Sequence, residues 1–149
     1  MIIDSFRDEY WFLSMFSPVL IIGAHNLAYG SGEAAFHGGK TSDPEIRAWI
    51  AAAPTPSEAK RRGRSRRVAL RPDWDSYRHV VMQAVLRQKF SHPELAELLA
   101  KTGDAELVEG NSWHDNFWGD CRCSRAACER PGENFLGRYL MELRSGLSR

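Results

Sequence analysis

The chain has 149 residues, of which 43% are hydrophobic and 26% are charged. A chain of this length buries roughly two thirds of its unfolded surface, so it can form a core without disulfides or metal. The net charge of +1 argues against a general nucleic-acid coat protein, and the composition excludes disordered and collagen-like chains. We therefore expect a single globular domain over residues 1–149.

The N-terminal third predicts a short β element. Residues 19–22 form an apolar, β-prone run, residues 23–26 resemble a turn, and residues 27–29 can return as a second strand. The glycines at 30 and 32 then interrupt the pattern. We expect few strands elsewhere, apart from a short one at Leu107 and Val108.

The segment after residue 32 predicts a helix with chemically useful side chains. On such a helix, Glu33, Phe36, His37 and Lys40 share one face. Glu33 and Lys40 would then stand two turns, or about 10 Å, apart. A carboxylate can act as acid or base and a desolvated lysine as a nucleophile, so a substrate could lie between them. By spacing alone, however, a solvated pair on an amphipathic helix fits better.

Capping signals predict five further helices. Their expected starts are Asp43–Pro44, Thr55–Pro56, Asp73 or Asp75, residues 91–94, and Asn134. With so many helices and so few strands, the sequence predicts a mainly α fold: a compact single-domain helical bundle with a small β element.

A basic run lies at residues 60–67, with six Lys or Arg residues in eight positions. Arginine suits bidentate phosphate binding, and such a run can also contact RNA or DNA. A solvated basic face is the ordinary alternative. The near-neutral net charge does not favour the nucleic-acid interpretation.

Residues 111–132 look irregular and combine a carboxylate with aromatic rings. Asp115 precedes Trp118 by three positions, and Trp74 and Trp113 add two further indole rings. Aromatic rings with a few polar groups can stack on and orient a flat heterocycle. Taken one by one, these tryptophans fit core packing equally well or better.

The three cysteines all lie between positions 121 and 128. Cys121, Cys123 and Cys128 could join His114 as four zinc ligands, but the spacing lacks a standard C-x-x-C pair. The odd count favours reduced free thiols in a reducing compartment. No signal peptide and no apolar run of roughly 20 residues is present, so we expect a cytoplasmic protein without a membrane partner.

Common nucleotide-binding and hydrolase motifs are absent from the sequence. It contains no P-loop, no G-x-G-x-x-G, no H-E-x-x-H and no G-x-S-x-G. Nucleotide hydrolysis, dinucleotide-dependent redox chemistry and serine-hydrolase chemistry are therefore not supported.

Taken together, the ordered motifs resemble the NADAR family, also called YbiA-like. The resemblance rests on Phe6-Arg7, Phe12-Leu13-Ser14-x-Phe16, Tyr29-x-Ser31-x-Glu33-x-x-Phe36-x-x-x-Lys40, Ala59-Lys60-x-x-Gly63-Arg64, Asp73-Trp74-Asp75, Lys89-Phe90, Thr102-Gly103, Leu107-Val108-Glu109, Asp115-x-x-Trp118-Gly119 and Asn134-x-Leu136-Gly137. It implies a compact, mainly helical fold and an N-glycosidase. The implied substrates are phosphorylated ribosylaminopyrimidine intermediates of riboflavin biosynthesis, or ADP-ribose attached to guanine, which can belong to a nucleic acid.

The same resemblance assigns roles to matched positions. It implies catalytic roles for Glu33, Lys40 and Asp115, and no cofactor. It implies a substrate-binding set of Arg7, Phe36, Arg64, Trp74, Trp118 and Asn134. Lys40 is either a nucleophile that forms a Schiff base or an electrostatic clamp. Glu33, Lys40, Trp74, Asp115 and Trp118 are expected to converge on one pocket, with Arg64 at its phosphate end.

The sequence departs from the family pattern in three places, of which the first two bear on the substrate. Met15 and Ala34 replace an Asn and a His that are usual in the family, and many members lack the insert from Cys121 to Cys128. Two other functions remain open: a module that binds ADP-ribose without hydrolysing it, and a nucleic-acid-binding protein that uses residues 60–67.

Overall fold

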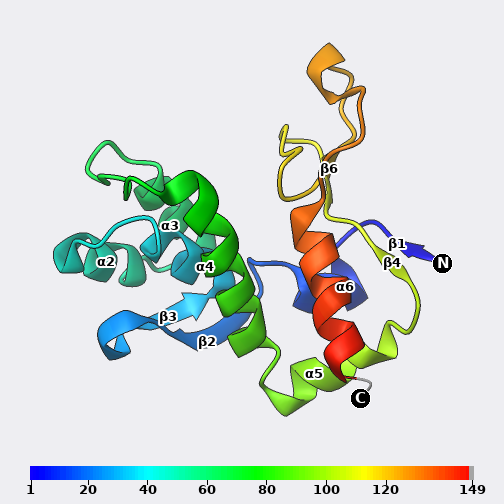
Figure 1. Cartoon of the computed structure of the whole chain (residues 1–149), viewed down its shortest axis with the longest axis horizontal. Coiled ribbons are helices and arrows are strands. Elements are labelled where there is room, and N and C mark those ends of the chain that lie inside the picture. The colour runs from blue at the N-terminus through cyan, green and yellow to red at the C-terminus, as the bar shows by residue number, and fades with distance from the viewer. Residues whose placement is uncertain (148–149) are drawn as a thin grey trace. The chain divides into compact units, whose positions relative to one another are not determined.

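The computed structural model describes residues 1–147 (Figure 1). It contains two compact units: unit 1 combines residues 1–14 with the chain from Phe90 onward, and unit 2 spans residues 15–89. Both units are built mainly from helices, with three separate two-stranded β pairs. The predicted mainly α fold with a small β element is confirmed, whereas a single domain over residues 1–149 stays a prediction.

Unit 2 consists of a β-hairpin followed by four helices. The strands β2 (Pro18–Ile22) and β3 (Ala28–Ser31) pair antiparallel, which confirms the predicted hairpin. The helices are α1 (Gly32–Gly38), α2 (Pro44–Ala51), α3 (Pro56–Gly63) and α4 (Trp74–Lys89).

The predicted N-caps fix two of these helix starts. The Asp43 carboxylate accepts a hydrogen bond from the Glu45 backbone N–H at 2.9 Å, and the Thr55 hydroxyl accepts one from Glu58 at 3.1 Å. In each helix a proline occupies the first turn, where its missing N–H costs nothing. At α1 the Ser31 hydroxyl accepts from the Ala34 backbone N–H at 3.1 Å.

Helix α1 is the centre of unit 2 and is shorter than the sequence predicts. Every residue from Ala34 to Gly38 is buried, because the helix packs against α2, α3 and α4. It ends at Gly38, whose missing side chain lets the Tyr29 ring pack against the backbone. The prediction that Lys40 lies on this helix is therefore wrong: Lys40 follows the helix in a turn.

Unit 1 combines two α-helices with short strands. The helices are α5 (Pro93–Lys101) and α6 (Phe135–Leu147), with the 3₁₀ turns η1 (Asp8–Leu13) and η3 (Ala126–Cys128). The strands pair in parallel: β1 (Ile2–Ile3) with β4 (Glu106–Leu107), and β5 (Gly110–Asn111) with β6 (Asp120–Cys121). Strand β4 lies one residue before the predicted position.

The start of α6 differs from the prediction in its use of Asn134. The helix begins after Asn134 as expected, and the Asn134 backbone carbonyl accepts a hydrogen bond from Arg138. Its side chain, however, bonds to another segment: Oδ1 accepts from the Glu109 N–H at 3.0 Å, and Nδ2 donates to the Leu107 carbonyl at 2.9 Å. Asn134 thus ties the start of α6 to the chain beyond β4.

Among residues 1–147, no helix is both long and apolar enough to span a bilayer.

Candidate active site

A carboxylate and an imidazole form the centre of the site in unit 2. Glu33 and His37 lie one turn apart on α1, and His37 Nε2 lies 2.9 Å from Glu33 Oε1. Their side chains are 15% and 4% exposed, so the pair is largely shielded from water.

His37 has a defined protonation state at neutral pH. Burial lowers the pKa of His37, and the hydrogen bond to Glu33 only partly opposes this effect. The imidazole is therefore neutral at pH 7, with Nε2–H donating to the carboxylate. Among the described residues, buried His37 Nδ1 has no hydrogen-bond partner, which also fits a bare lone pair at that atom.

Gly63, at the end of α3, joins His37 to Lys40. Lys40 Nζ donates a hydrogen bond to the Gly63 carbonyl at 3.2 Å. A Cβ atom added at Gly63 would collide with the His37 ring. The absence of a side chain at Gly63 therefore lets α3 approach α1 closely enough for Lys40 to reach its backbone.

Lys40 titrates far below an ordinary lysine. Burial, followed by the positive charge of Arg64, lowers the pKa of Lys40 to about 8, although Glu33 acts in the opposite direction. At pH 7 roughly one tenth of the amine is unprotonated, compared with less than one part in a thousand for an unperturbed lysine. Lys40 is also partly buried, as a lysine nucleophile requires.

The basic run at residues 60–67 divides into two groups. Arg61 and Arg62 both bond to Glu58, and the Arg67 guanidinium lies 4.1 Å from the centre of the Trp49 ring. These arginines stabilise the surface of α2 and α3. Lys60 and the exposed Arg64 instead lie near enough to Lys40 to lower its pKa.

Two aromatic residues support the Glu33–His37 pair from the interior. The Phe36 ring lies 5.5 Å from the His37 ring and 5.3 Å from the Trp74 ring, measured between centroids. Phe36 and Trp74 are both buried. Their observed contacts are core packing, so a direct contact of either ring with substrate stays a prediction.

Asp115 and Trp118 lie in unit 1, in a loop held by its own polar side chains. Asp115 Oδ1 accepts hydrogen bonds from the backbone N–H groups of Phe117 and Trp118 at 3.0 and 2.9 Å. The Trp118 ring packs edge-on against Phe117, with 4.7 Å between centroids. Asp115 therefore fixes the position of Trp118, whatever its other role.

The remaining predicted binding residues also divide between the units. Arg7 is exposed at the start of η1, and the Asn134 amide is bonded to backbone groups of unit 1. Unit 2 therefore contains Glu33, Phe36, Lys40, Arg64 and Trp74, whereas unit 1 contains Arg7, Asp115, Trp118 and Asn134. The convergence of both groups on one pocket stays a prediction.

His37 is a candidate site residue to which the sequence assigns no role. Its signal was available, because an imidazole four residues after a carboxylate lies within hydrogen-bond reach on a helix. What the sequence could not reveal is that the imidazole is buried, and that Gly63 packs against it.

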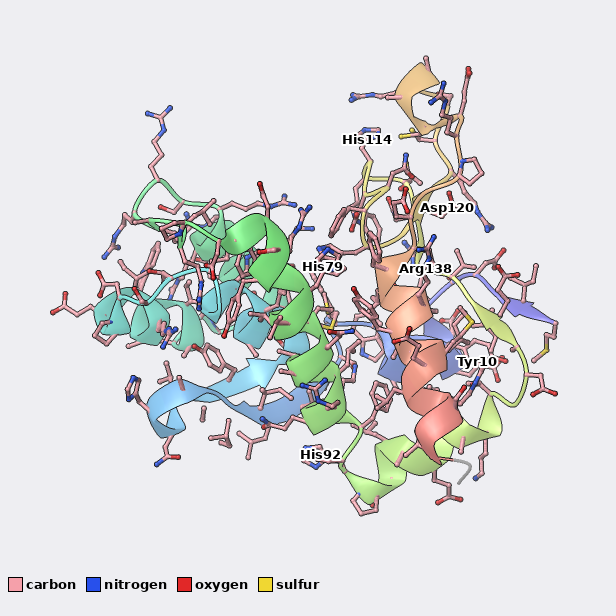
Figure 2. The ribbon with its side chains drawn as sticks, viewed as in Figure 1. Tyr10, His79, His92, His114, Asp120 and Arg138 are labelled. Atoms are coloured by element: carbon pink, nitrogen blue, oxygen red, sulfur yellow. The ribbon has the colours of Figure 1, made fainter. Side chains whose placement is uncertain are left out.

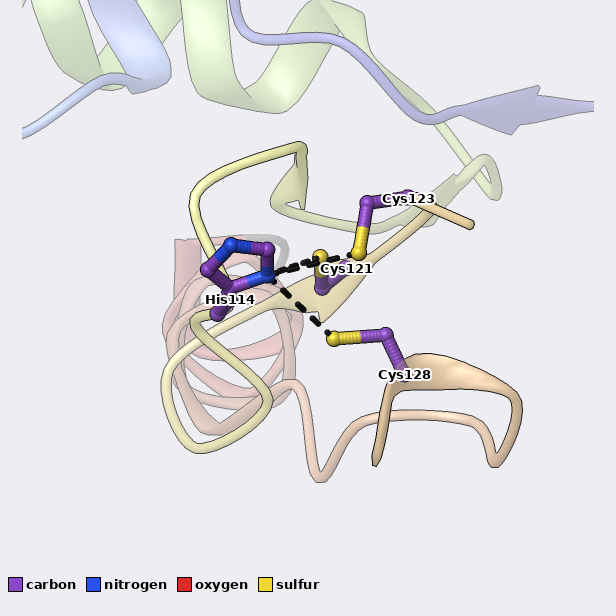
Figure 3. A group of neighbouring side chains, drawn as sticks. All are labelled: His114, Cys121, Cys123 and Cys128. Carbon is purple, nitrogen blue, oxygen red and sulfur yellow. Dashed lines mark hydrogen bonds between the residues drawn. The ribbon is translucent and has the colours of Figure 1, made fainter. Parts of the chain in front are cut away.

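A second group of chemically active side chains lies in unit 1. Figure 2 shows His114 in a loop and Asp120 in β6, both in the segment that precedes α6, whose first turn carries Arg138. We call residues 112–132 the Cys/His loop. Its side chains His114, Cys121, Cys123 and Cys128 bring their four ligand atoms within 4.8 Å of one another (Figure 3).

Several known proteins similar to this chain are named N-glycosidases. The N-glycosidase YbiA of Escherichia coli is 36% identical over 147 residues, which cover 97% of this chain and 86% of that protein. Its NMR structure matches this fold with a TM-score of 0.80 and 34% identity, covering 99% of this chain and 85% of the other. An N-glycosidase of Nostoc punctiforme is 44% identical over 105 residues, covering 70% of this chain and 63% of that protein.

A further relative carries a different name. A riboflavin biosynthesis protein of Vibrio vulnificus is 33% identical over 141 residues, covering 94% of this chain but only 36% of that protein. The model of the NADAR domain matches residues 4–148. The chain therefore belongs to the NADAR domain family, in its YbiA-like N-glycosidase branch.

Proposed function

We propose that this protein hydrolyses the N-glycosidic bond of a phosphorylated ribosyl substrate at the Glu33–Lys40 site. The observation that carries the proposal is that Glu33 and Lys40, both in unit 2, each bond to a different partner. Glu33 is bonded to neutral His37, while Lys40 donates to the Gly63 carbonyl and has a pKa of about 8. The carboxylate and the amine are thus held close together without neutralising each other.

Glu33 supplies the electrostatic part of the reaction. Cleavage of an N-glycosidic bond builds positive charge at the anomeric carbon, which a nearby carboxylate stabilises. His37 fixes one oxygen of Glu33 at 2.9 Å, so the carboxylate is oriented before substrate binds. An oriented carboxylate pays little reorganisation energy during the reaction.

Lys40 supplies the nucleophile in this proposal. Its neutral amine attacks the anomeric carbon of the ring-opened sugar, the bond to the base nitrogen breaks, and that nitrogen leaves with a proton. The resulting Schiff base then adds water at the same carbon, which releases the sugar and restores the amine. The net reaction consumes one water and needs no redox partner.

Cations beside Lys40 suit the phosphate of the substrate. Arg64 is exposed, and both Arg64 and Lys60 lie near the amine of Lys40. A guanidinium binds a phosphate through two parallel hydrogen bonds, so we assign Arg64 to the phosphate and Lys60 to a supporting role.

Unit 1 contributes a second set of groups in the proposed enzyme. Asp115 is proposed to protonate the leaving base, and Trp118 to stack on it. Arg7 is proposed as a further phosphate contact, and Phe36 and Trp74 are proposed to contact the substrate. The Asn134 side chain ties the start of α6 to the backbone of Leu107 and Glu109 through its two hydrogen bonds.

Within this class we favour a ribosylaminopyrimidine phosphate over ADP-ribosylated guanine. Relatives named as riboflavin biosynthesis proteins support this choice. Met15 and Ala34 also affect the choice of substrate, because both lie beside Glu33. The Glu33 N–H donates a hydrogen bond to the Met15 carbonyl at 2.9 Å, and Ala34 follows Glu33 on α1. Changes at these positions lie next to the catalytic carboxylate.

A direct assay tests the function and the substrate together. Purified protein is incubated separately with a ribosylaminopyrimidine phosphate and with ADP-ribosylated guanosine, and base release is followed by chromatography. We expect release from the first substrate, and its loss in Glu33→Gln. Faster release from the guanosine conjugate would overturn the substrate choice. Tight ADP-ribose binding without release of base from either compound would overturn the enzyme proposal in favour of a binding module.

A further inference from the structure

The Cys/His loop has almost no apolar core of its own. Between residues 112 and 132, only Gly119, Cys121 and Cys128 are buried. Ordering a loop of this length costs conformational entropy, which apolar burial usually offsets. Here the buried side chains are two cysteines, and they gather around one point with Cys123 and His114.

The geometry of that point matches four-coordinate zinc. The His114 Nδ1 atom lies 3.9, 3.3 and 3.6 Å from the sulfur atoms of Cys121, Cys123 and Cys128 (Figure 3). A tetrahedral zinc ion with bonds of about 2.3 Å to sulfur and about 2.05 Å to nitrogen separates such atoms by roughly 3.6 Å. The three distances bracket this value.

The backbone around the ligands supports the same conclusion. The Arg125 N–H points at Cys123 Sγ at 3.5 Å, as suits a sulfur carrying negative charge. Asn116 links the two arms of the loop: its Oδ1 accepts from the Cys121 N–H at 2.7 Å, and its Nδ2 lies 3.5 Å from the Ala127 carbonyl.

His114 is aimed at the cluster by an uncommon backbone conformation. Its φ is +70°, in the left-handed region that favours glycine and asparagine. Asn111 holds this turn, because its side chain accepts from the backbone N–H groups of Trp113 and Asp115. The conformation directs Nδ1 toward the three sulfur atoms.

We propose that His114, Cys121, Cys123 and Cys128 bind one structural zinc ion that holds the Cys/His loop together. Three thiolates and one imidazole complete a tetrahedron and leave no open position for a reacting water, so the site is structural. The metal closes the segment that carries Asp115 and Trp118, the two unit 1 residues proposed to act on the base. This assignment replaces the free thiols that the odd number of cysteines favours.

Metal analysis of the full-length protein is the first test. Protein produced in zinc-supplemented medium is dialysed, and zinc and iron are measured per chain. We expect about one zinc per chain in the wild type and little in Cys128→Ser or His114→Asn. The matched control is His25→Asn, because exposed His25 also has a left-handed backbone, with φ of +58°. It should retain about one zinc.

Two measurements on the wild type keep the proposal testable if the variants fail to fold. Cobalt added to chelator-treated protein should give the visible bands of tetrahedral thiolate ligation. Trypsin should cut at Arg122 or Arg125 on the order of tenfold faster after chelator treatment, because the loop loses its crosslink. Wild-type protein without zinc, with iron in its place, or with unchanged cleavage after chelation would overturn the proposal.

Discussion

The segment around Glu33 and the Cys/His loop both collect chemically active side chains, but they hold them by different means. In unit 2, helices α1 and α3 carry Glu33, His37 and Gly63, and their packing sets the distances between the polar atoms. The Cys/His loop contains little regular structure and relies on side chains that bond to its own backbone. A polar substitution in α1 should therefore affect chemistry more than folding, whereas a substitution in the loop should affect folding first.

The largest effect is expected for Glu33→Gln. Glutamine keeps the oxygen that accepts the His37 hydrogen bond, so the helix should remain intact while the negative charge is lost. We expect kcat/KM for base release to fall about a thousandfold with little change in Tm. Glu58→Gln removes a surface carboxylate of α3 and serves as the control. A loss below threefold in Glu33→Gln would show that the carboxylate does not act in catalysis.

A single added carbon atom at Gly63 should disrupt the contact between α1 and α3. In Gly63→Ala the new Cβ would collide with the buried His37 ring, so we expect a loss of about 2 kcal/mol in the free energy of unfolding. Gly30→Ala is the matched control, because a Cβ at Gly30 meets nothing within 4 Å. Urea unfolding of both variants measures the difference. Equal stability of the two would mean that α3 does not pack closely on His37.

In unit 1, substitution of Asn134 tests whether its side chain has a structural role or binds substrate. Asn134→Ala removes two hydrogen bonds and leaves alanine at φ of +51°, which together should cost about 2 kcal/mol of stability. Asn134→Gly removes the same bonds without the strain and should be less destabilised. If both variants keep wild-type stability but raise KM, the side chain binds substrate instead.

Lys40 should carry a smaller and pH-dependent stability cost. Its pKa of about 8 lies below the usual value in unfolded chains, so between about pH 8 and 10.4 the unfolded state binds more protons. The free energy of unfolding should therefore rise with pH across that interval. Lys40→Met should abolish this rise and stabilise the protein by about 1 kcal/mol at pH 7, a small figure because solvent screens the partly exposed amine.

Exposed Lys101 provides the control for this series. Its amine pairs with Glu97 on the surface of α5, so Lys101→Met should keep the wild-type pH dependence. Unfolding in urea at several pH values measures all three proteins. An unchanged pH dependence in Lys40→Met would contradict the lowered pKa.

Features that depend on neighbouring residues can be predicted from the sequence, whereas features that depend on distant contacts cannot. The caps at Asp43 and Thr55 and the hairpin turn depend on neighbouring residues, so local patterns predict them correctly. The end of α1 depends on Tyr29 packing against Gly38, which local spacing does not reveal. The helix therefore stops two residues before Lys40.

The candidate sites follow the same rule. Helical spacing brings Glu33 and Lys40 to notice and the family motifs assign their roles, whereas the neutral state of His37 arises from burial by several helices. The spacing of the cysteines argued against a metal, because no C-x-x-C pair is present. Their convergence with His114 depends on a left-handed residue and on Asn111, Asn116 and β6, none of which the cysteine count reports.

Trapping with borohydride during turnover tests the central claim most directly. The reductant is added while the protein cleaves the ribosylaminopyrimidine phosphate, and peptides are analysed by mass spectrometry. The account predicts a reduced sugar phosphate attached to Lys40 in the wild type and no adduct in Lys40→Ala. Absence of any adduct, with Lys40→Arg keeping most of the activity, would contradict the account and leave Lys40 as an electrostatic clamp.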